Sequence, residues 1–320
     1  MLFPHRPLVA SNASRSIAFV SALLAILFFF VVLYRSWGAG RNLSSFGGRL
    51  GLGKPEPPTT IPKKLWYKLG PKGLSDEARA WTDTCIRNNT DYRVEFMTEE
   101  AADVYVQAAF GMRHPKLVEV YLGLSIPILK ADLLRYLLLF AEGGVYNDLD
   151  VTCDAPIDDW IPAQYKDSTA VVVGWEFDVG WGDNFIREFA TWTIMAKPGS
   201  PHIWQVIEDT VEFFEKKVKE NNVPLGKLTL DMTGDVVDAT GPRRFTNGLF
   251  KSMEKIYGAR ASIEHVMELM EPKLLGDVLV LPGFSFAAGS NTYDEGVVLP
   301  PPLVTHHYAG TWKNKNGGEQ

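Results

Sequence analysis

Residues 126–151 read IPILKADLLRYLLLFAEGGVYNDLDV, and the rest of the chain is arranged around this stretch. Lys130 to Glu142 is rich in helix formers and nearly continuous in Leu, Ala and Phe, which predicts a helix buried on most sides. Asp132 and Arg135 lie three residues apart and therefore share one face of this helix. An isolated buried charge costs several kcal/mol. We therefore expect these two charges to be paired or to face a polar cavity.

The second half of the stretch predicts a turn and a short strand that carries two carboxylates. Gly143 and Gly144 end the helix, because Gly tolerates the left-handed conformation that a C-cap needs. A strand is expected to begin at 145–146 and to run into Asp148 and Asp150. Residues two apart in an extended segment point to the same side, so both carboxylates should face one spot. Neighbouring carboxylates repel, and a divalent cation is the common remedy.

This block resembles the fungal α-1,6-mannosyltransferases of glycosyltransferase family 32, which start and extend N-glycan outer chains. The shared features are a buried helix with Asp and Arg, a Gly pair, an aromatic residue and an Asp-x-Asp at a strand end. In this sequence they are Asp132, Arg135, Gly143, Gly144, Tyr146, Asp148 and Asp150. An Asp-x-Asp alone is a weak signal, since a solvated strand end also produces one. The charges upstream on an apolar helix favour a metal site.

Other segments resemble the same family. They are an opening strand at 61–67, a stretch at 189–201, a Thr-Gly-Pro turn at 240–242, a late strand at 277–282 and a terminal motif at 306–313. Ser200 stands where the family commonly has His, and Thr311 where it has Ser. The Thr-Gly-Pro turn either caps the next helix or shapes the acceptor site. The resemblance covers residues 61–313 and implies a GT-A nucleotide-sugar transferase fold, a Rossmann-like mixed sheet flanked by helices.

The sequence pattern itself also predicts an α/β fold. Strands and helices are expected to alternate, with strands at 61–67, 92–97, 170–175 and 277–282 and helices at 75–87, 98–110, 202–219 and 243–257. Ser75 and Thr98 are suitable N-caps, each followed by acidic residues. Such alternation indicates a sheet layered by helices. Ligands of these sheets collect at the carboxyl ends of strands, where Asp148 and Asp150 fall.

The first sixty residues predict a membrane anchor and a linker. The expected domains are a cytosolic tail (1–16), a transmembrane signal anchor (17–34), a stem (35–60), the GT-A catalytic domain (61–313) and a tail (314–320). The apolar run spans about 26 Å as a helix, enough for a thin early-secretory bilayer. A cleaved signal peptide is the alternative, because residues 38–40 are small. Basic residues after the run favour the reverse orientation, whereas the resemblance implies a lumenal catalytic domain, which we adopt.

Composition excludes several function classes. The net charge of −6 argues against a nucleic-acid partner. Cys85 and Cys153 are the two cysteines, too few for a Cys-rich zinc site, and they are compatible with either a disulfide or two buried thiols. The sequence contains no nucleophile elbow, zinc-protease helix motif or Walker loop.

The resemblance implies roles for the charged residues of the block. Asp150 is expected to bind the metal, and Asp148 to hold the ribose or a metal-bound water. Asp132 is expected to hydrogen-bond hydroxyls of the donor sugar, with Arg135 orienting it. The predicted catalytic residues are therefore Asp132, Asp148 and Asp150.

Residues outside the block complete the predicted site. His306 is the expected third metal ligand, with His307 as the alternative. Oxygen ligands with one imidazole suit Mn²⁺, with Mg²⁺ second. An aromatic at the end of the opening strand, Trp66 or Tyr67, either stacks on the nucleotide base or only packs. The predicted nucleotide-sugar-binding residues are Trp66, Asp132, Arg135, Asp148, Trp312 and Lys313.

The resemblance implies transfer of mannose from GDP-mannose with retention of the α configuration. An N-glycan in outer-chain synthesis, through an α-1,6 linkage, is the expected acceptor. A sphingolipid, another acceptor, another sugar nucleotide and a catalytically silent glycan-binding protein are the alternatives. We expect a single-pass type II protein of the Golgi membrane with a lumenal catalytic domain. The resemblance leaves open whether it acts as a subunit of a mannosyltransferase complex.

Overall fold

The computed structural model describes residues 59–182, 184–258 and 261–309. The chain divides into two compact units, 1–56 and 57–320, and all described residues belong to the second. The predicted membrane anchor, and Trp312 and Lys313, lie outside the described residues. Within the described ranges, no helix combines the length and the apolar composition that crossing a membrane requires.

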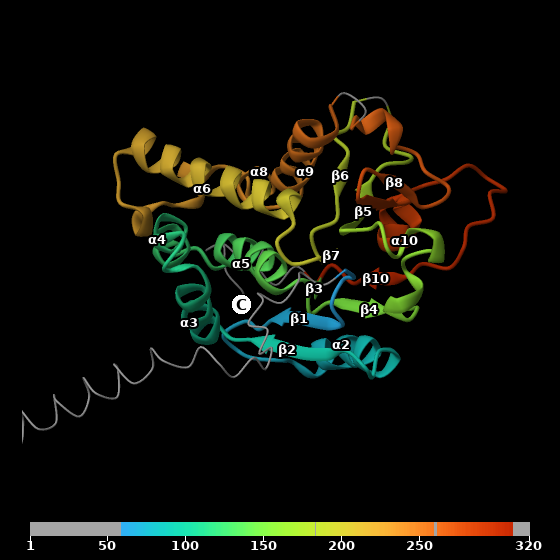
Figure 1. The fold of residues 1–320 in the computed structure, drawn as a ribbon, viewed down its shortest axis with the longest axis horizontal. Helices are drawn as coiled ribbons and strands as arrows, with labels where there is room; N and C mark the ends of the chain where they lie inside the picture. Colours follow the sequence, from blue (N-terminus) through green and yellow to red (C-terminus); the bar gives the residue numbers. More distant parts are fainter. Residues whose placement is uncertain (1–58, 183, 259–260, 310–320) are drawn as a thin grey trace, which may run out of the picture. The chain divides into compact units, whose positions relative to one another are not determined.

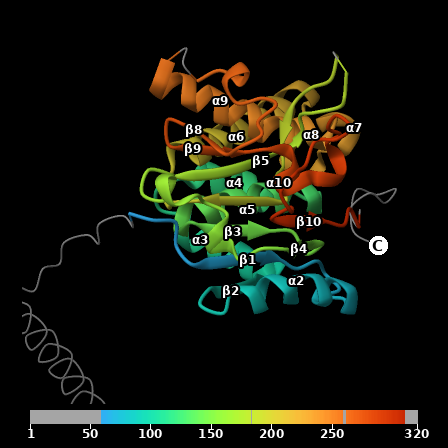
Figure 2. The ribbon, with the colours of Figure 1, turned by 90° about the vertical axis from the view of Figure 1, so that its right-hand side faces the viewer.

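A mixed β-sheet lies at the centre of the described unit. Its order is β2 (Arg93–Met97), β1 (Lys64–Lys68), β3 (Gly144–Asn147), β7 (Thr193–Ala196), β5 (Val171–Phe177), β9 (Val278–Leu281) and β8 (Lys273–Leu275), with β6 (Glu188–Phe189) paired to β5. Figure 2 shows this order from β8 and β9 at the top to β1 and β2 at the bottom. The mixed α/β architecture is confirmed.

Strand direction decides which chain segments meet at the carboxyl edge of the sheet. β1 is parallel to β2 and β3, and β5 is parallel to β9. β7 is antiparallel to both β3 and β5, so β3 and β5 run in the same direction. The residues that follow β3, the end of β5 and the residues that precede β7 therefore share one edge.

Helices cover one face of the sheet and a mixed layer covers the other. The helices α3 (Glu99–Phe110), α4 (Pro115–Gly123), α5 (Pro127–Glu142), α6 (Pro201–Asn221), α8 (Val236–Ala239) and α9 (Pro242–Tyr257) share a core with Trp66 and Tyr146. The opposite core contains Leu65, Tyr67 and Val145, as alternation along a strand requires. It is completed by α2 (Asp76–Asn88), α10 (Gly283–Ala287) and the two-stranded sheet of β4 (Val151–Cys153) and β10 (Val304–His306). Figure 1 shows α3 to α6 to the left of the sheet, and α10, β4 and β10 to the right.

The predicted helix starts are confirmed at atomic detail. The Ser75 hydroxyl accepts the N–H of Ala78 at 3.1 Å, and the Thr98 hydroxyl accepts that of Ala101 at 3.2 Å. Prolines occupy the first turns of four helices, namely α4, α5, α6 and α9. Four helices of the described residues were not expected from the pattern: α4, α7 (Leu230–Thr233), α8 and α10.

The Gly pair after α5 is required by both conformation and space. Gly143 and Gly144 have φ of 68° and 101°, which an L side chain rarely adopts. A Cβ on Gly143 would lie 2.7 Å from the carbonyl oxygen of Ala196, and one on Gly144 would lie 2.5 Å from that of Lys64. The chain can therefore turn directly from the buried helix into the central strand β3.

Cys85 and Cys153 form a disulfide bond. It joins α2 to the end of β4, across 68 residues of sequence. Of the two alternatives that the sequence left open, the structure therefore has the covalent one. The bond therefore ties β4, the strand that directly follows Asp150, covalently to α2.

Candidate active site

Arg135 holds three chain segments together at the carboxyl edge of the sheet. Its Nη2 lies 2.6 Å from Asp132 Oδ1 on the same helix and 3.5 Å from Asp148 Oδ1 after β3. Its Nη1 donates to the carbonyl of Thr191, just before β7. The guanidinium also lies over the ring of Tyr146, 4.9 Å from its centroid. The predicted Asp132–Arg135 pair is confirmed, and the side chain of each is 5% exposed.

Asp132 is held at both carboxylate oxygens. Oδ1 accepts from Arg135, and Oδ2 accepts the hydroxyl of Thr240 at 2.7 Å. The Thr240 carbonyl in turn accepts the hydroxyl of Tyr136 at 2.8 Å. Burial raises the pKa of Asp132, while Arg135 and Thr240 oppose that rise. The Thr-Gly-Pro turn therefore anchors Asp132, a role beyond the two considered from sequence.

The prediction that Asp148 to Asp150 continues the strand is wrong. β3 ends at Asn147, residues 149–150 form a turn, and β4 begins at Val151. The alternation of side chains along a strand therefore does not determine which way the two carboxylates point. Asp148 is positioned by the end of β3 and by Arg135, whereas Asp150 is positioned by contacts with the distant segment that follows β10.

The two carboxylates of the motif differ in acidity. Burial raises the pKa of Asp148 to about 6; Arg135 opposes this rise and the charge of Asp150 adds to it. Burial also acts against ionisation of Asp150, but His306 and the N–H of Ala309 outweigh it and hold the pKa of Asp150 below its ordinary value. Asp150 therefore keeps its charge near neutral pH more readily than Asp148.

His306, and not His307, faces the acidic pair. His306 Nε2 lies 3.3 Å from Asp150 Oδ1, and the ring packs against Trp192 at 4.5 Å and Tyr308 at 4.1 Å between centroids. The His307 ring instead stacks on Trp81 at 4.6 Å. Adjacent residues at the end of β10 point to opposite sides, which explains the difference.

Comparisons with known proteins identify relatives of this chain. Residues 75–167 match the family model described as "Glycosyltransferase sugar-binding region containing DXD motif". The chain is 31% identical over 266 residues to the initiation-specific alpha-1,6-mannosyltransferase of Schizosaccharomyces pombe, covering 79% of this chain and 64% of that protein. This chain is a relative of the DXD-containing glycosyltransferases.

Two further proteins are similar to this chain. The initiation-specific alpha-1,6-mannosyltransferase of Candida albicans is 29% identical over 287 residues, covering 79% of this chain and 72% of that protein. Among solved structures, the PaToxG glycosyltransferase aligns over 62% of this chain and 72% of that chain, with a TM-score of 0.45 and 16% identity. The chain thus spans about two thirds of the length of the S. pombe relative. The resemblance inferred from the DXD block is confirmed.

The donor atoms at this edge of the sheet fit a divalent cation. Within the described ranges, no three His, Cys, Asp or Glu side chains are already grouped as a metal cage. Two carboxylates and one imidazole do lie at the same edge of the sheet, in Asp148, Asp150 and His306. Mn²⁺ and Mg²⁺ are commonly held by one or two carboxylates, with substrate phosphates and water filling the other positions. The residues therefore fit such a cation, without specifying which one.

The structure does not bring Trp66 to the site. Its side chain is 2% exposed, its indole N–H donates to the Gly143 carbonyl at 2.9 Å, and Lys64 Nζ lies 3.8 Å from its ring centroid. Tyr67 is also buried and stacks on Phe96. Neither ring offers a face to a nucleotide base, so the packing alternative fits the structure.

Glu176 is a site residue that the sequence did not indicate. It lies near the end of β5 and is 7% exposed. Burial raises its pKa to about 7; His306 opposes this rise, and Glu188 adds to it. The sequence did contain one indication of this residue, namely an acidic side chain inside the otherwise apolar run VVVGWEF. Its position beside His306 depends on the direction of β5, which the local pattern does not contain.

Proposed function

We propose that the chain is a retaining, metal-dependent GT-A enzyme that transfers mannose from GDP-mannose to a glycan acceptor. An α-1,6 transfer in N-glycan outer-chain synthesis is the specific reaction. The observation that carries the proposal is the position of Arg135, which bonds Asp132 and lies beside Asp148, next to Asp150 and His306. Similarity to initiation-specific mannosyltransferases over 79% of the chain supports the choice of sugar.

The residues of the chain prepare the site before the donor arrives. Arg135 and Thr240 fix Asp132, so its remaining lone pairs are already oriented toward the sugar hydroxyls. Preorganised groups of this kind need no rearrangement during the reaction, which is where their catalytic value lies. The rings of Trp192 and Tyr308 enclose His306 and limit water on that side of the acidic pair.

Asp150 and His306, with Asp148, would hold the cation. When bound, Mn²⁺ or Mg²⁺ neutralises the charge that develops on the leaving diphosphate. Asp148 would hold the donor ribose or a metal-bound water, and Arg135 would keep Asp148 in place. The acceptor attacks from the side of the leaving group in a retaining transfer of this type, so no separate general base is assigned.

The disulfide favours a lumenal location for the catalytic unit. Disulfides persist in oxidising compartments and are rare in the cytosol. This supports a type II protein of the Golgi membrane, anchored by residues 17–34, with the acceptor glycan encountered in the lumen.

An assay of the full chain against a panel of sugar nucleotides tests the proposal. We expect consumption of GDP-mannose in preference to UDP-sugars, loss of turnover with a chelator, and recovery with Mn²⁺. A parent protein that consumes no GDP-mannose, or that ignores the chelator, contradicts it.

A further inference from the structure

A short loop after β5 presents one aromatic ring at the edge of the site. Trp181 is 48% exposed and stands between Gly180 and Gly182, whose φ values are 87° and 74°. A Cβ on Gly180 would lie 2.6 Å from Cβ of Thr292 and 2.7 Å from its backbone oxygen. The turn therefore requires glycine at position 180, because a side chain there would collide with Thr292.

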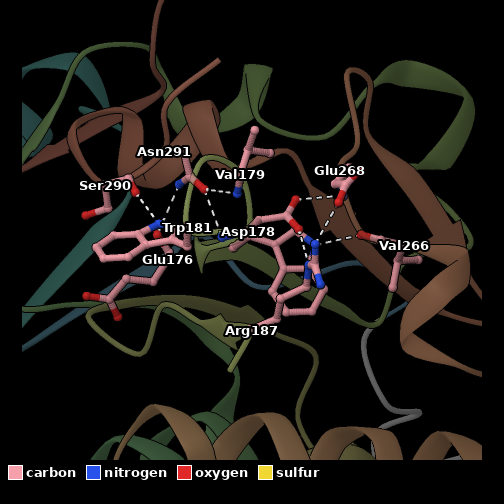
Figure 3. A network of polar contacts seen from close by, with 10 residues as sticks. Glu176, Asp178, Val179, Trp181, Arg187, Val266, Glu268, Ser290 and Asn291 are labelled. Carbon is pink, nitrogen blue, oxygen red and sulfur yellow. Dashed lines mark hydrogen bonds and ion pairs between the residues drawn. The ribbon is translucent and has the colours of Figure 1, made fainter. Parts of the chain in front are cut away.

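The indole is held at its polar edge, although about half of the residue is exposed. Its N–H donates to the carbonyl of Ser290 at 2.7 Å (Figure 3). Phe177 supports the ring from β5 in an edge contact, with centroids 4.9 Å apart. The hydrogen bond to Ser290 and the contact with Phe177 together restrict rotation of the Trp181 side chain.

Two buried polar residues tie the base of the loop to the rest of the fold. Asn291 Oδ1 accepts the N–H groups of Asp178 and Val179, both at 2.9 Å (Figure 3). The Asp178 carboxylate accepts from Arg187 Nε at 2.9 Å and from the N–H of Glu268 at 2.8 Å. The loop is thus rigidly placed by contacts with three separate segments of chain.

Trp181 is connected to the acidic pair by consecutive contacts. The Ser290 hydroxyl lies 2.6 Å from the hydroxyl of Tyr308, and the Tyr308 ring lies 4.1 Å from that of His306. His306 in turn contacts Asp150 at 3.3 Å. Trp181 therefore belongs to the same edge of the sheet as the reacting centre.

Glu176, near the end of β5, is a second polar group of this region, and its carboxylate interacts electrostatically with His306 and Asp148. Figure 3 shows its side chain extending to the same side as the Trp181 ring. Glu176 is 7% exposed, and His306 and the Trp192 side chain both interact with its carboxylate. A carboxylate has several lone pairs, so one hydroxyl of a ligand on the indole could still be accepted at its exposed edge.

We propose that Trp181 is the stacking platform for the mannosyl residue of the acceptor, with Glu176 accepting one of its hydroxyls and Tyr308 bordering it on the His306 side. This inference rests on the proposed function, since it names the acceptor end of the same site. A pyranose has an apolar C–H face that packs on an aromatic ring, and polar edges that need hydrogen-bond partners. A ring already fixed loses little conformational freedom on binding. One indole matches one sugar, whereas a stable protein partner needs roughly 1,000 Å² of contact.

The test compares three variants of the full chain, Trp181→Ala, Trp181→Phe and Met112→Ala. Met112 is 96% exposed in the turn after α3, and its loss controls for removal of an exposed apolar side chain. Methyl α-D-mannopyranoside serves as the acceptor probe. Its binding is followed by saturation-transfer NMR in the presence of GDP and diamagnetic Mg²⁺, and its use as acceptor is followed by steady-state kinetics with GDP-mannose and Mn²⁺. Circular dichroism and the melting temperature establish that each variant is folded.

We expect Trp181→Ala to raise the acceptor KM on the order of tenfold, the scale of one aromatic contact, and to lose the NMR signal. Trp181→Phe should recover part of both, and Met112→Ala should match the parent. Hydrolysis of GDP-mannose without acceptor, and the donor KM, should stay within about twofold in all three, because the platform touches only the acceptor. Parental acceptor binding by Trp181→Ala, or a parent that binds no mannoside, overturns the inference. A parent that binds the mannoside but consumes no GDP-mannose instead contradicts the proposed function.

Discussion

Single residues in this site act mainly by positioning one another. Arg135 bonds Asp132 and the Thr191 carbonyl and lies beside Asp148, so a change at Arg135 disturbs both acids at once. Asp132 has the further anchor at Thr240. The sequence predicted the Asp132–Arg135 pair from spacing alone. It could not predict Thr240, which lies 108 residues away from Asp132 in the chain.

Thr240→Val tests the anchoring of Asp132. Valine keeps the shape but removes the hydroxyl that Asp132 Oδ2 accepts, which should cost about 1–2 kcal/mol of unfolding free energy. GDP-mannose turnover should fall about tenfold, because Asp132 loses one of two fixed contacts. Urea unfolding and donor hydrolysis measure the two effects.

Thr210→Val is the matched control for this change. Thr210 is also buried, but its hydroxyl bonds the Val206 carbonyl within α6, far in sequence from the site. It should lose a similar amount of stability with unchanged turnover. Equal losses of turnover in the two variants would show that Thr240 acts only through stability.

Secondary-structure elements followed the sequence closely where local chemistry controls them. Caps, first-turn prolines and apolar runs placed α2, α3, α5 and α9 and the strands β1, β2, β5 and β9 within a few residues. The turn at 149–150 was missed, because contacts with the segment after β10 shape it. Glu176 and Trp181 were not singled out from the sequence for the same reason, since strand direction and the Asn291 contacts are long-range.

The disulfide should stabilise the element that follows the acidic turn. Replacing Cys85 and Cys153 together by Ser should lower the unfolding free energy by about 2–4 kcal/mol, as expected for a loop of this length. Urea unfolding with and without reductant measures the effect. Reductant should bring the parent to the stability of the double variant and leave the variant itself unchanged. A parent that is indifferent to reductant while unfolding would argue against the bond.

On the scale of the whole described unit, acid should weaken a contact far from the site. Asp277, before β9, accepts from Tyr257 at 2.8 Å and lies 2.7 Å from His202 Nε2. Burial acts against its ionisation, but these partners outweigh it and lower the pKa of Asp277. A folded pKa below the unfolded one gives stability that is present above the unfolded value, about 3.9, and is lost as pH falls through the folded value.

Asp277→Asn should therefore flatten the loss of stability below about pH 4. Urea midpoints measured from pH 3 to pH 7 provide the test, with Asp294→Asn, at an exposed loop position, as the control. The control should keep the acid dependence of the parent. If Asp277→Asn had the same acid dependence as the parent, the contacts of Asp277 would not contribute to the loss of stability in acid.

Mn²⁺-dependent consumption of GDP-mannose by Asp150→Asn, measured alongside Asp154→Asn, tests whether Asp150 is a ligand of the cation. Asn keeps an acceptor for the Ala309 N–H, and relief of the repulsion with Asp148 offsets the weakened contact with His306, so the melting temperature should change little. Turnover should fall by about 100-fold or more, because a ligand of the cation is lost. Asp154, whose carboxylate accepts from Thr305 at the surface, should be replaceable without effect. A folded Asp150→Asn protein that consumes GDP-mannose at close to the parental rate would contradict the account.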